Sequence, residues 1–161
     1  MEFIIDNQVV LIDDEDWTLV QGYNWHISRK GYVVAKIGPA SRRRDVFLHR
    51  LVLRFSFGDH VLVDHIHHIL TDCRKSELRT VNYSQNSMNH KVLERSSSRH
   101  SGVCFDRSRS RWKAYIGVSR RRVYLGNFNT KEDSIRARNL AEKLYFGEYA
   151  YIEQGVSCIK I

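Results

Sequence analysis

One stretch of the chain, residues 63–89, constrains the fold more than any other. It contains adjacent Asp64 and His65, then Glu77, then Asn86. Twelve residues separate His65 from Glu77 and twenty-one separate it from Asn86. That is room for a strand, a loop, a second short strand and the start of a helix. The spacing therefore predicts a hairpin followed by a helix.

These residue types suit metal-dependent cleavage of a phosphodiester bond. Hydrolysis needs a water deprotonated near neutral pH, and histidine is the side chain whose unperturbed pKa lies there. It also needs a hard cation on the phosphate, and such cations prefer oxygen ligands, which Asp64 and Asn86 offer. Adjacent side chains on a strand point to opposite faces, so a site shared by Asp64 and His65 requires a twist or bulge.

Five runs in this part of the chain carry a resemblance to a known family: residues 47–52, 64–65, 72–74, 76–78 and 84–89. They are similar to the HNH motif of phage and intron-encoded homing endonucleases. The resemblance implies a DNA endonuclease that nicks double-stranded DNA. It implies that His65 is the general base, that Asp64 and Asn86 hold one Mg²⁺ or Mn²⁺, and that the residue at position 77 orients the imidazole.

The chain departs from that family at three places. The family usually has Asn at the position of Glu77, Asn-Gly at the position of His67-His68, and often Asn at the position of Cys73. A carboxylate accepts a hydrogen bond from the imidazole as Asn does but cannot also donate, so Glu77 leaves a loop carbonyl unsatisfied. His67-His68 replaces a turn in which Gly tolerates positive φ. The alternative is a catalytically impaired DNA-binding protein or regulator with an HNH fold.

Other groups near the motif have competing interpretations. His49 is either a buried structural histidine or a catalytic one. Zinc is disfavoured because the His and Cys residues of segment 65–73 lack a second ligand pair. The acidic run 13–16 suits a helix start better than a metal site. Cysteines 73, 104 and 158 are widely spaced, which implies no disulfide framework and fits a reducing compartment.

Basic charge is concentrated in one segment. Residues 91–125 contain ten Lys or Arg and two acidic residues, which equals the net charge of +8 of the whole chain. Within this segment, residues 111–118 alternate apolar and polar side chains as a half-buried strand does, and aromatic residues lie between the arginines. A turn at 119–121 and a second strand-like run at 122–128 follow.

A helix is predicted after these strands. Thr130 and Asp133 form a capping box, and Gly147 is a plausible C-terminal stop. The apolar residues that recur at helical spacing are Ile135, Leu140, Ala141 and Leu144.

Three strands before one helix, with residues 101–103 at the start and residues 124–130 before the helix, resemble the plant ethylene-response-factor DNA-binding domain. Phage HNH nucleases often carry a similar domain. The resemblance implies that the sheet enters the major groove, while Trp112, Ala114 and Ile116 face the helix. The residues expected to meet DNA are Arg107, Arg109, Arg111, Lys113, Tyr115, Arg120, Arg121, Arg122 and Tyr124.

Sequence preference is expected to be weak. Cys104 and Phe105 stand where the plant domain has base-reading arginines, and Gly117 lacks a side chain at a position that often contacts DNA. Phosphate contacts then supply much of the affinity. A second basic spot beside the nuclease motif, Arg42, Arg43 and Arg44, is expected to grip the backbone of the cut strand.

The expected fold class is α+β, with a ββα-metal module followed by a three-stranded antiparallel sheet packed on one helix. The expected domains are residues 1–92 with the nuclease motif at 47–91, a linker at 93–100, the DNA-binding domain at 101–150, and a tail at 151–161. No secretory signal or membrane span is evident. We expect a monomer inside a cell, in the cytoplasm of a bacterial or phage-infected cell.

Overall fold

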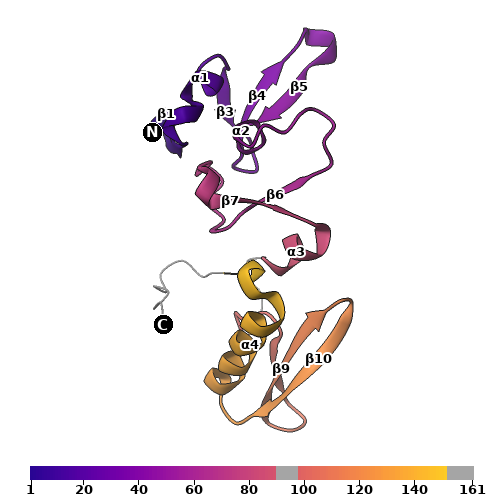
Figure 1. Cartoon of the computed structure of the whole chain (residues 1–161). Helices are drawn as coiled ribbons and strands as arrows, with labels where there is room; N and C mark the ends of the chain where they lie inside the picture. The colour runs from indigo at the N-terminus through magenta and orange to yellow at the C-terminus, as the bar shows by residue number, and fades with distance from the viewer. Residues whose placement is uncertain (90–97, 152–161) are drawn as a thin grey trace. The chain divides into compact units, whose positions relative to one another are not determined.

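A computed structural model of the chain describes residues 1–89 and 98–151. Contacts divide these residues into two compact units, residues 1–83 and residues 84–151 (Figure 1). Both units combine short helices with antiparallel strands. The α+β class predicted from the sequence is confirmed.

The first unit begins with a tight hairpin. Strands β1 (Glu2–Ile5) and β2 (Gln8–Leu11) pair in antiparallel register across Asp6 and Asn7. The two turn residues have φ of 48° and 63°, which is the left-handed conformation of a type I′ turn. A 3-10 turn, η1 (Asp14–Asp16), and helix α1 (Trp17–Val20) follow, so the acidic run does begin a helical segment.

A three-stranded antiparallel sheet comes next. Its order is β3 (Trp25–Ile27), β4 (Val33–Ile37) and β5 (Arg44–Phe47), with the 3-10 turn η2 (Ala40–Arg42) before β5. Helix α2 (Leu48–Val52) starts directly at the end of β5.

A second hairpin carries the nuclease-like motif. Strand β6 (Leu62–His65) pairs with β7 (Leu78–Val81), and the 3-10 turn η3 (Lys75–Glu77) leads into β7. Helix α3 (Tyr83–Met88) follows in the sequence. The predicted order of hairpin and helix is confirmed.

One apolar core holds the first unit together. Val10, Ile12, Leu48 and Val52 have fully buried side chains, and Leu78 brings β7 into the same cluster. Burying one side chain of this size stabilises the fold by about 1.5–3 kcal/mol. This packing fixes the β6–β7 hairpin against α2, which is the arrangement that positions the candidate site.

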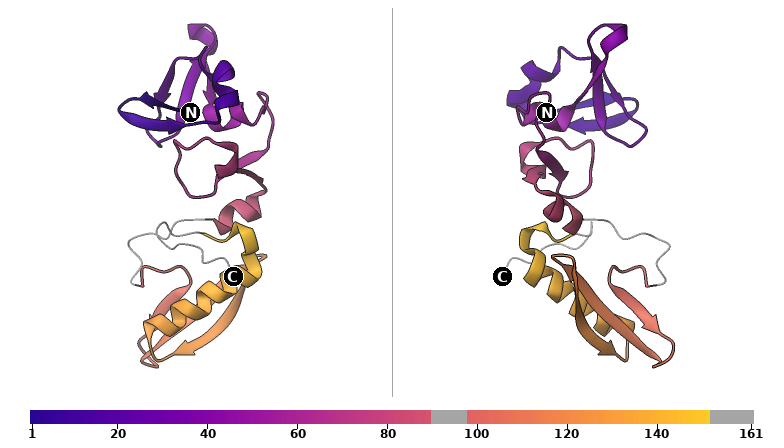
Figure 2. Two further views of the ribbon diagram at one scale, coloured as in Figure 1. Left: turned by 60° about the vertical axis from the view of Figure 1, so that its left-hand side comes forward. Right: turned by 90° about the vertical axis from the view of Figure 1, so that its right-hand side faces the viewer.

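The second unit is a sheet covered by a helix. Strands β8 (Val103–Asp106), β9 (Arg111–Val118) and β10 (Arg121–Phe128) form an antiparallel sheet with β9 in the centre. Helix α4 (Lys131–Phe146) lies along the sheet, as Figure 2 shows, and the 3-10 turn η4 (Gly147–Tyr149) follows it. The predicted three-stranded sheet packed on one helix is confirmed.

Helix α4 has the predicted ends. The Thr130 hydroxyl accepts from the backbone N–H of Asp133 at 3.1 Å and donates to its carboxylate at 2.6 Å. The helix ends at Phe146, and Gly147 has a φ of 54°. Both ends are therefore set by local chemistry that the sequence contains.

The residues that α4 buries differ from those that the spacing of its apolar residues predicted. Ala141 packs against Ile116 of the sheet, but Leu140 and Leu144 are 68% and 78% exposed. A buried Arg138 takes a place on the inner face instead, paired with Glu142 at 2.7 Å. Helical spacing predicted the helix correctly, but it did not predict that both leucines of the helix are exposed.

Gly102 marks a close approach of two backbones. It has a φ of 68°, and its carbonyl accepts from the backbone N–H of Tyr115 at 2.9 Å. A Cβ at this position would lie 2.1 Å from the Tyr115 carbonyl oxygen. Only glycine fits here without a shift of the backbone.

Part of the predicted domain scheme lies outside the described residues. This applies to residues 90–92 of the predicted first domain, to residues 93–97 of the predicted linker and to all of the predicted tail except Tyr151. In residues 1–89 and 98–151, no helix is both long and apolar enough to cross a bilayer.

Candidate functional site

Regular strand pairing sets the directions of Asp64 and His65. Asp64 lies opposite Arg79 and His65 lies opposite Leu78, without a register shift between these strands. Side chains alternate faces on such a ladder, and the regular pairing contains no bulge, so of the expected twist or bulge only a twist stays a prediction. His65 shares a face with Val63 and the core, whereas Asp64 is on the other face. Because the two side chains are on opposite faces, they can share a ligand only where β6 ends, at His65.

An ion pair engages the Asp64 carboxylate. Arg79 donates to Oδ2 of Asp64 from Nε at 3.0 Å and from Nη2 at 2.8 Å. The side chains of Asp64 and Arg79 are only 7% and 13% exposed. Removing one partner of such a buried pair costs about 3–5 kcal/mol. Arg79 therefore fixes the orientation of the Asp64 carboxylate. A metal ion bound at Asp64 would share this carboxylate with the Arg79 guanidinium.

His65 is a buried imidazole. It is 5% exposed, and its ring packs against the rings of His49 and Tyr32. Burial lowers the pKa of His65 below its usual 6.5, although the charges of Asp64 and Asp72 oppose this shift. The ring is therefore neutral near pH 7, which is the form that accepts a proton from water.

His49 extends this buried cluster from helix α2. Its ring centroid lies 5.0 Å from that of His65 at an interplanar angle of 70°, and 5.5 Å from that of Tyr32. Burial, assisted by charge on His65 and Arg50, lowers the pKa of His49 to about 3. Of the two interpretations of His49, its burial fits the structural one, and the ring contact links it to His65.

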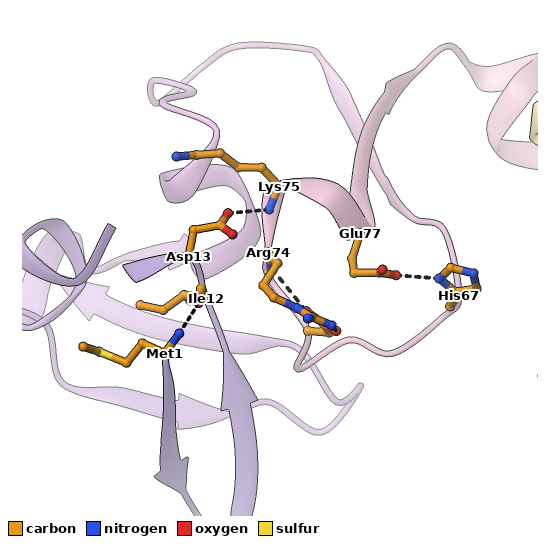
Figure 3. A network of polar contacts seen from close by, with 8 residues as sticks. Met1, Ile12, Asp13, His67, Arg74, Lys75 and Glu77 are labelled. Carbon is orange, nitrogen blue, oxygen red and sulfur yellow. Dashed lines mark hydrogen bonds and ion pairs between the residues drawn. The ribbon is translucent and has the colours of Figure 1, made fainter. Parts of the chain in front are cut away.

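Glu77 meets a different histidine from the one predicted. Its carboxylate lies 2.5 Å from Nδ1 of His67 (Figure 3). Its backbone carbonyl accepts from the N–H of Ile66. The next residue, His68, has a φ of 58°. Two of the three positions at which the chain departs from the HNH motif, Glu77 and His67, thus contact each other. The turn at His68 requires the left-handed conformation that Gly adopts at least cost. Orientation of His65 by Glu77 stays a prediction.

The loop between β6 and β7 is tied to the N-terminal segment. The carboxylate of Asp13 accepts from the backbone N–H of Lys75 at 2.8 Å (Figure 3). The Lys75 ammonium pairs with Glu15 and, at 2.9 Å, with the fully buried Asp16. The acidic run that begins the helical segment therefore also anchors the loop.

Asp72 and Cys73 complete the loop. Burial alone would raise the pKa of Asp72, but hydrogen bonds and charge from Arg74 lower it below its usual value. Burial raises the pKa of Cys73 to about 12, so its thiol keeps its proton. Of the described cysteines, Cys73 and Cys104 are both free thiols.

The second predicted metal ligand lies in the other unit. Asn86 is an exposed residue of α3, and the division between the units falls before Ser84. Its closeness to Asp64 therefore stays a prediction. Among the described residues, no three His, Cys, Asp or Glu side chains form a metal-binding group. One carboxylate and one amide still fit Mg²⁺ or Mn²⁺, because such ions keep several water and phosphate ligands.

The sheet of the second unit has one polar face with basic and aromatic side chains. Tyr115 and Tyr124 are directly paired across β9 and β10, and the Arg122 guanidinium lies 4.3 Å from the Tyr115 ring centroid. The opposite face carries the fully buried Ala114 and Ile116 toward α4. The predicted alternation of sides is correct for these residues.

Apart from Lys113, the remaining predicted DNA contacts lie at strand ends and turns. Arg107 and Arg109 are exposed between β8 and β9, and Arg120 has a φ of 63° in the turn before β10. Lys113 lies on the polar face 3.9 Å from Asp106. Arg111 and Arg121 are exposed at the ends of β9 and β10.

The second basic spot is in the first unit. Arg42, Arg43 and Arg44 are exposed where η2 leads into β5. The Arg44 guanidinium stacks 4.7 Å from the ring centroid of the exposed Phe57. These arginines are open to an anionic ligand, and their contact with DNA stays a prediction.

Sequence reasoning missed Arg79 and Tyr32. Arg79 could have been found by fixing the register of the hairpin, because pairing His65 with Leu78 places Arg79 opposite Asp64. No pattern in the sequence indicates that Tyr32, between β3 and β4, contacts His49 and His65.

The chain is similar to an uncharacterized HNH endonuclease of Acanthamoeba polyphaga mimivirus, with 28% identity over 137 residues. These residues are 84% of this chain and 70% of the relative. No family model and no solved structure matches the chain. The likeness supports a nuclease of the HNH kind.

Proposed function

We propose that the chain is a metal-dependent DNA endonuclease of the HNH homing type, which nicks double-stranded DNA as a monomer. The observation that carries the proposal is His65 at the end of β6, which burial keeps neutral and which follows Asp64 directly in the chain. A neutral imidazole and an adjacent carboxylate are what hydrolysis of a phosphodiester requires. The mimivirus relative is named as an HNH endonuclease, which agrees with this reaction.

In this proposal each group of the chain has one role. His65 accepts a proton from the attacking water, and Glu77 orients it after leaving its contact with His67. Asp64 and Asn86 hold Mg²⁺ or Mn²⁺, which when bound neutralises charge on the phosphate and the leaving oxygen. Arg79 fixes Asp64 on its own face of the hairpin.

The second unit is proposed to bind the duplex. Its fold of three strands and one helix agrees with the predicted ethylene-response-factor-type domain, and its polar face presents Tyr115, Arg122 and Tyr124. A two-stranded surface of this kind fits the major groove. The exposed arginines at its turns supply phosphate contacts, which hold the protein on DNA without reading sequence.

A second function is favoured by three features of the site. The strands around Asp64 and His65 pair without a bulge, Arg79 engages Asp64, and Glu77 engages His67. Each feature works against assembly of a cleavage site. The second candidate is therefore an HNH-fold protein or regulator that binds DNA without cutting it.

The two functions differ in cation-dependent cleavage. The full chain would be incubated with a supercoiled plasmid library of random inserts in Mg²⁺, Mn²⁺ or EDTA, beside a mobility-shift assay on the same DNA. The endonuclease produces nicked circles with a divalent cation and none with EDTA. A mobility shift without nicks in either cation would contradict the first proposal and support the second. The library removes dependence on one target sequence.

A further inference from the structure

The rings of Tyr32, His49 and His65 come from separate segments and pack together. Tyr32 precedes β4, His49 belongs to α2, and His65 ends β6. Their ring centroids are 5.5 Å apart for Tyr32 and His49, 6.1 Å for Tyr32 and His65, and 5.0 Å for His49 and His65. Each ring therefore contacts the other two.

The angles of these contacts restrict how the His65 ring can turn. The rings of His65 and His49 are inclined by 70°, an edge-to-face contact, and those of His65 and Tyr32 by 55°. Contacts between aromatic rings are directional, with edge-to-face and tilted arrangements preferred over a face-to-face sandwich. Rotation of His65 about its side-chain bonds would lose both contacts at once.

The two partners of His65 are themselves well held. His49 is 7% exposed on a helix whose Leu48 and Val52 are fully buried. The Tyr32 backbone N–H donates to the Ser28 hydroxyl at 3.0 Å, and its carbonyl accepts from the Ser28 N–H at 2.8 Å. Contact with these two rings therefore restricts the motion of the His65 side chain.

We propose that Tyr32 and His49 are positioning residues, which hold the His65 ring in one orientation for proton transfer. The inference rests on the proposed function, because it takes His65 as the base. It gives the N-terminal strands a part in the active site besides building the core. In this proposal Tyr32 and His49 act through His65.

The chain offers a matched control at Phe47. Its ring lies 5.9 Å from that of Tyr32 and 5.6 Å from that of His49. It is therefore in the same aromatic cluster, one contact removed from His65. If Tyr32 and His49 only pack in the core, substitution of Phe47 should affect the rate as much as substitution of either of them. If they position His65, substitution of Phe47 should affect the rate less.

The test compares flat rings with aliphatic side chains of similar bulk. His49→Leu and Tyr32→Leu should lower the single-turnover nicking rate by about tenfold or more while DNA affinity stays within about twofold, since misplacing a catalytic group acts on rate. His49→Phe and Tyr32→Phe should restore the rate to within about threefold. Phe47→Leu should leave the rate within about threefold. An equal loss in Phe47→Leu, or no rescue by phenylalanine, would overturn the proposal.

A second readout needs neither metal nor cleavage. In ¹H–¹³C spectra of the metal-free chain, the His65 ring should give one set of signals, shifted by its neighbouring rings. Tyr32→Leu, at a half-buried site, should broaden or split these signals because the ring samples several orientations. Unchanged, sharp His65 signals in Tyr32→Leu and His49→Leu would refute positioning. If the wild type never nicks DNA, the proposed function fails, and these spectra still decide whether the rings fix His65.

Discussion

Acid should destabilise the first unit because His49 is buried as the neutral imidazole. Its pKa is 6.5 in the unfolded chain and about 3 in the fold. Between these values the unfolded state binds a proton that the folded state does not, so stability falls as the pH falls. The contribution is present in full above pH 6.5 and is lost progressively toward pH 3.

The size of the effect follows from the shift. One pKa unit corresponds to about 1.36 kcal/mol, so lowering the pH from 7 to 5 removes about 2 kcal/mol through His49. His49 is only 7% exposed, so solvent screening reduces this value little. Burial also lowers the pKa of His65, which adds to the loss in the same direction. Ordinary carboxylates remain ionised above pH 5, so this window reports mainly on histidines.

Tryptophan fluorescence can isolate the first unit. Of the three tryptophans, Trp17 and Trp25 belong to its core and Trp112 lies on β9. Urea unfolding of Trp112→Phe at pH 7 and pH 5 should show the loss of about 2 kcal/mol or more. Adding His49→Phe should reduce the pH dependence by about 2 kcal/mol. Equal unfolding free energies at the two pH values would refute the assignment of His49 as buried and neutral.

Three further predictions concern the loop, the sheet and DNA binding. Glu77→Asn should raise the nicking rate by about tenfold, the lower end of what an orienting partner contributes, and a rate unchanged within twofold in the plasmid assay would contradict this. Gly102→Ala should lower the unfolding free energy of the second unit by about 3 kcal/mol or more, measured by urea unfolding followed through Trp112, because a Cβ would meet the Tyr115 carbonyl oxygen. If roughly six phosphates are neutralised, the log–log salt slope of DNA binding should be about −5, and Arg109→Ala should reduce its magnitude by about one. A slope near zero would contradict binding through phosphates.

Local signals in the sequence predicted much of the fold. Ser119-Arg120 occupies a two-residue turn with positive φ within the predicted turn at 119–121, and Thr130 caps α4 as predicted. Each of these outcomes depends on residues close in the chain, where turn and cap preferences act directly. The alternation of β9 likewise identified which side chains face α4. Burial on α4 was harder to predict, because Leu140 and Leu144 are exposed while the charged Arg138 is buried.

The site depends on contacts between distant segments, which is why the sequence predicted it only in part. Asp64 and His65 were identified from their chemistry and spacing. Their partner Arg79 is set by the hairpin register, which pairing His65 with Leu78 would have given. Their partner Tyr32 is set by packing of β4 against α2, which no local pattern encodes. The contact of Glu77 with His67 shows the same limit: the sequence marked both as departures without indicating that they pair.

The central claim is that His65 is the base of a metal-dependent nuclease. The most direct measurement is the single-turnover nicking rate of the plasmid library in Mn²⁺ for the wild type, His65→Ala and His60→Ala. His60 is an exposed histidine of the same unit and serves as the control. Loss of a general base should lower the rate by about 10² to 10⁴ in His65→Ala, with DNA affinity unchanged, and leave His60→Ala at the wild-type rate. A folded His65→Ala protein that nicks DNA at the wild-type rate would contradict the claim.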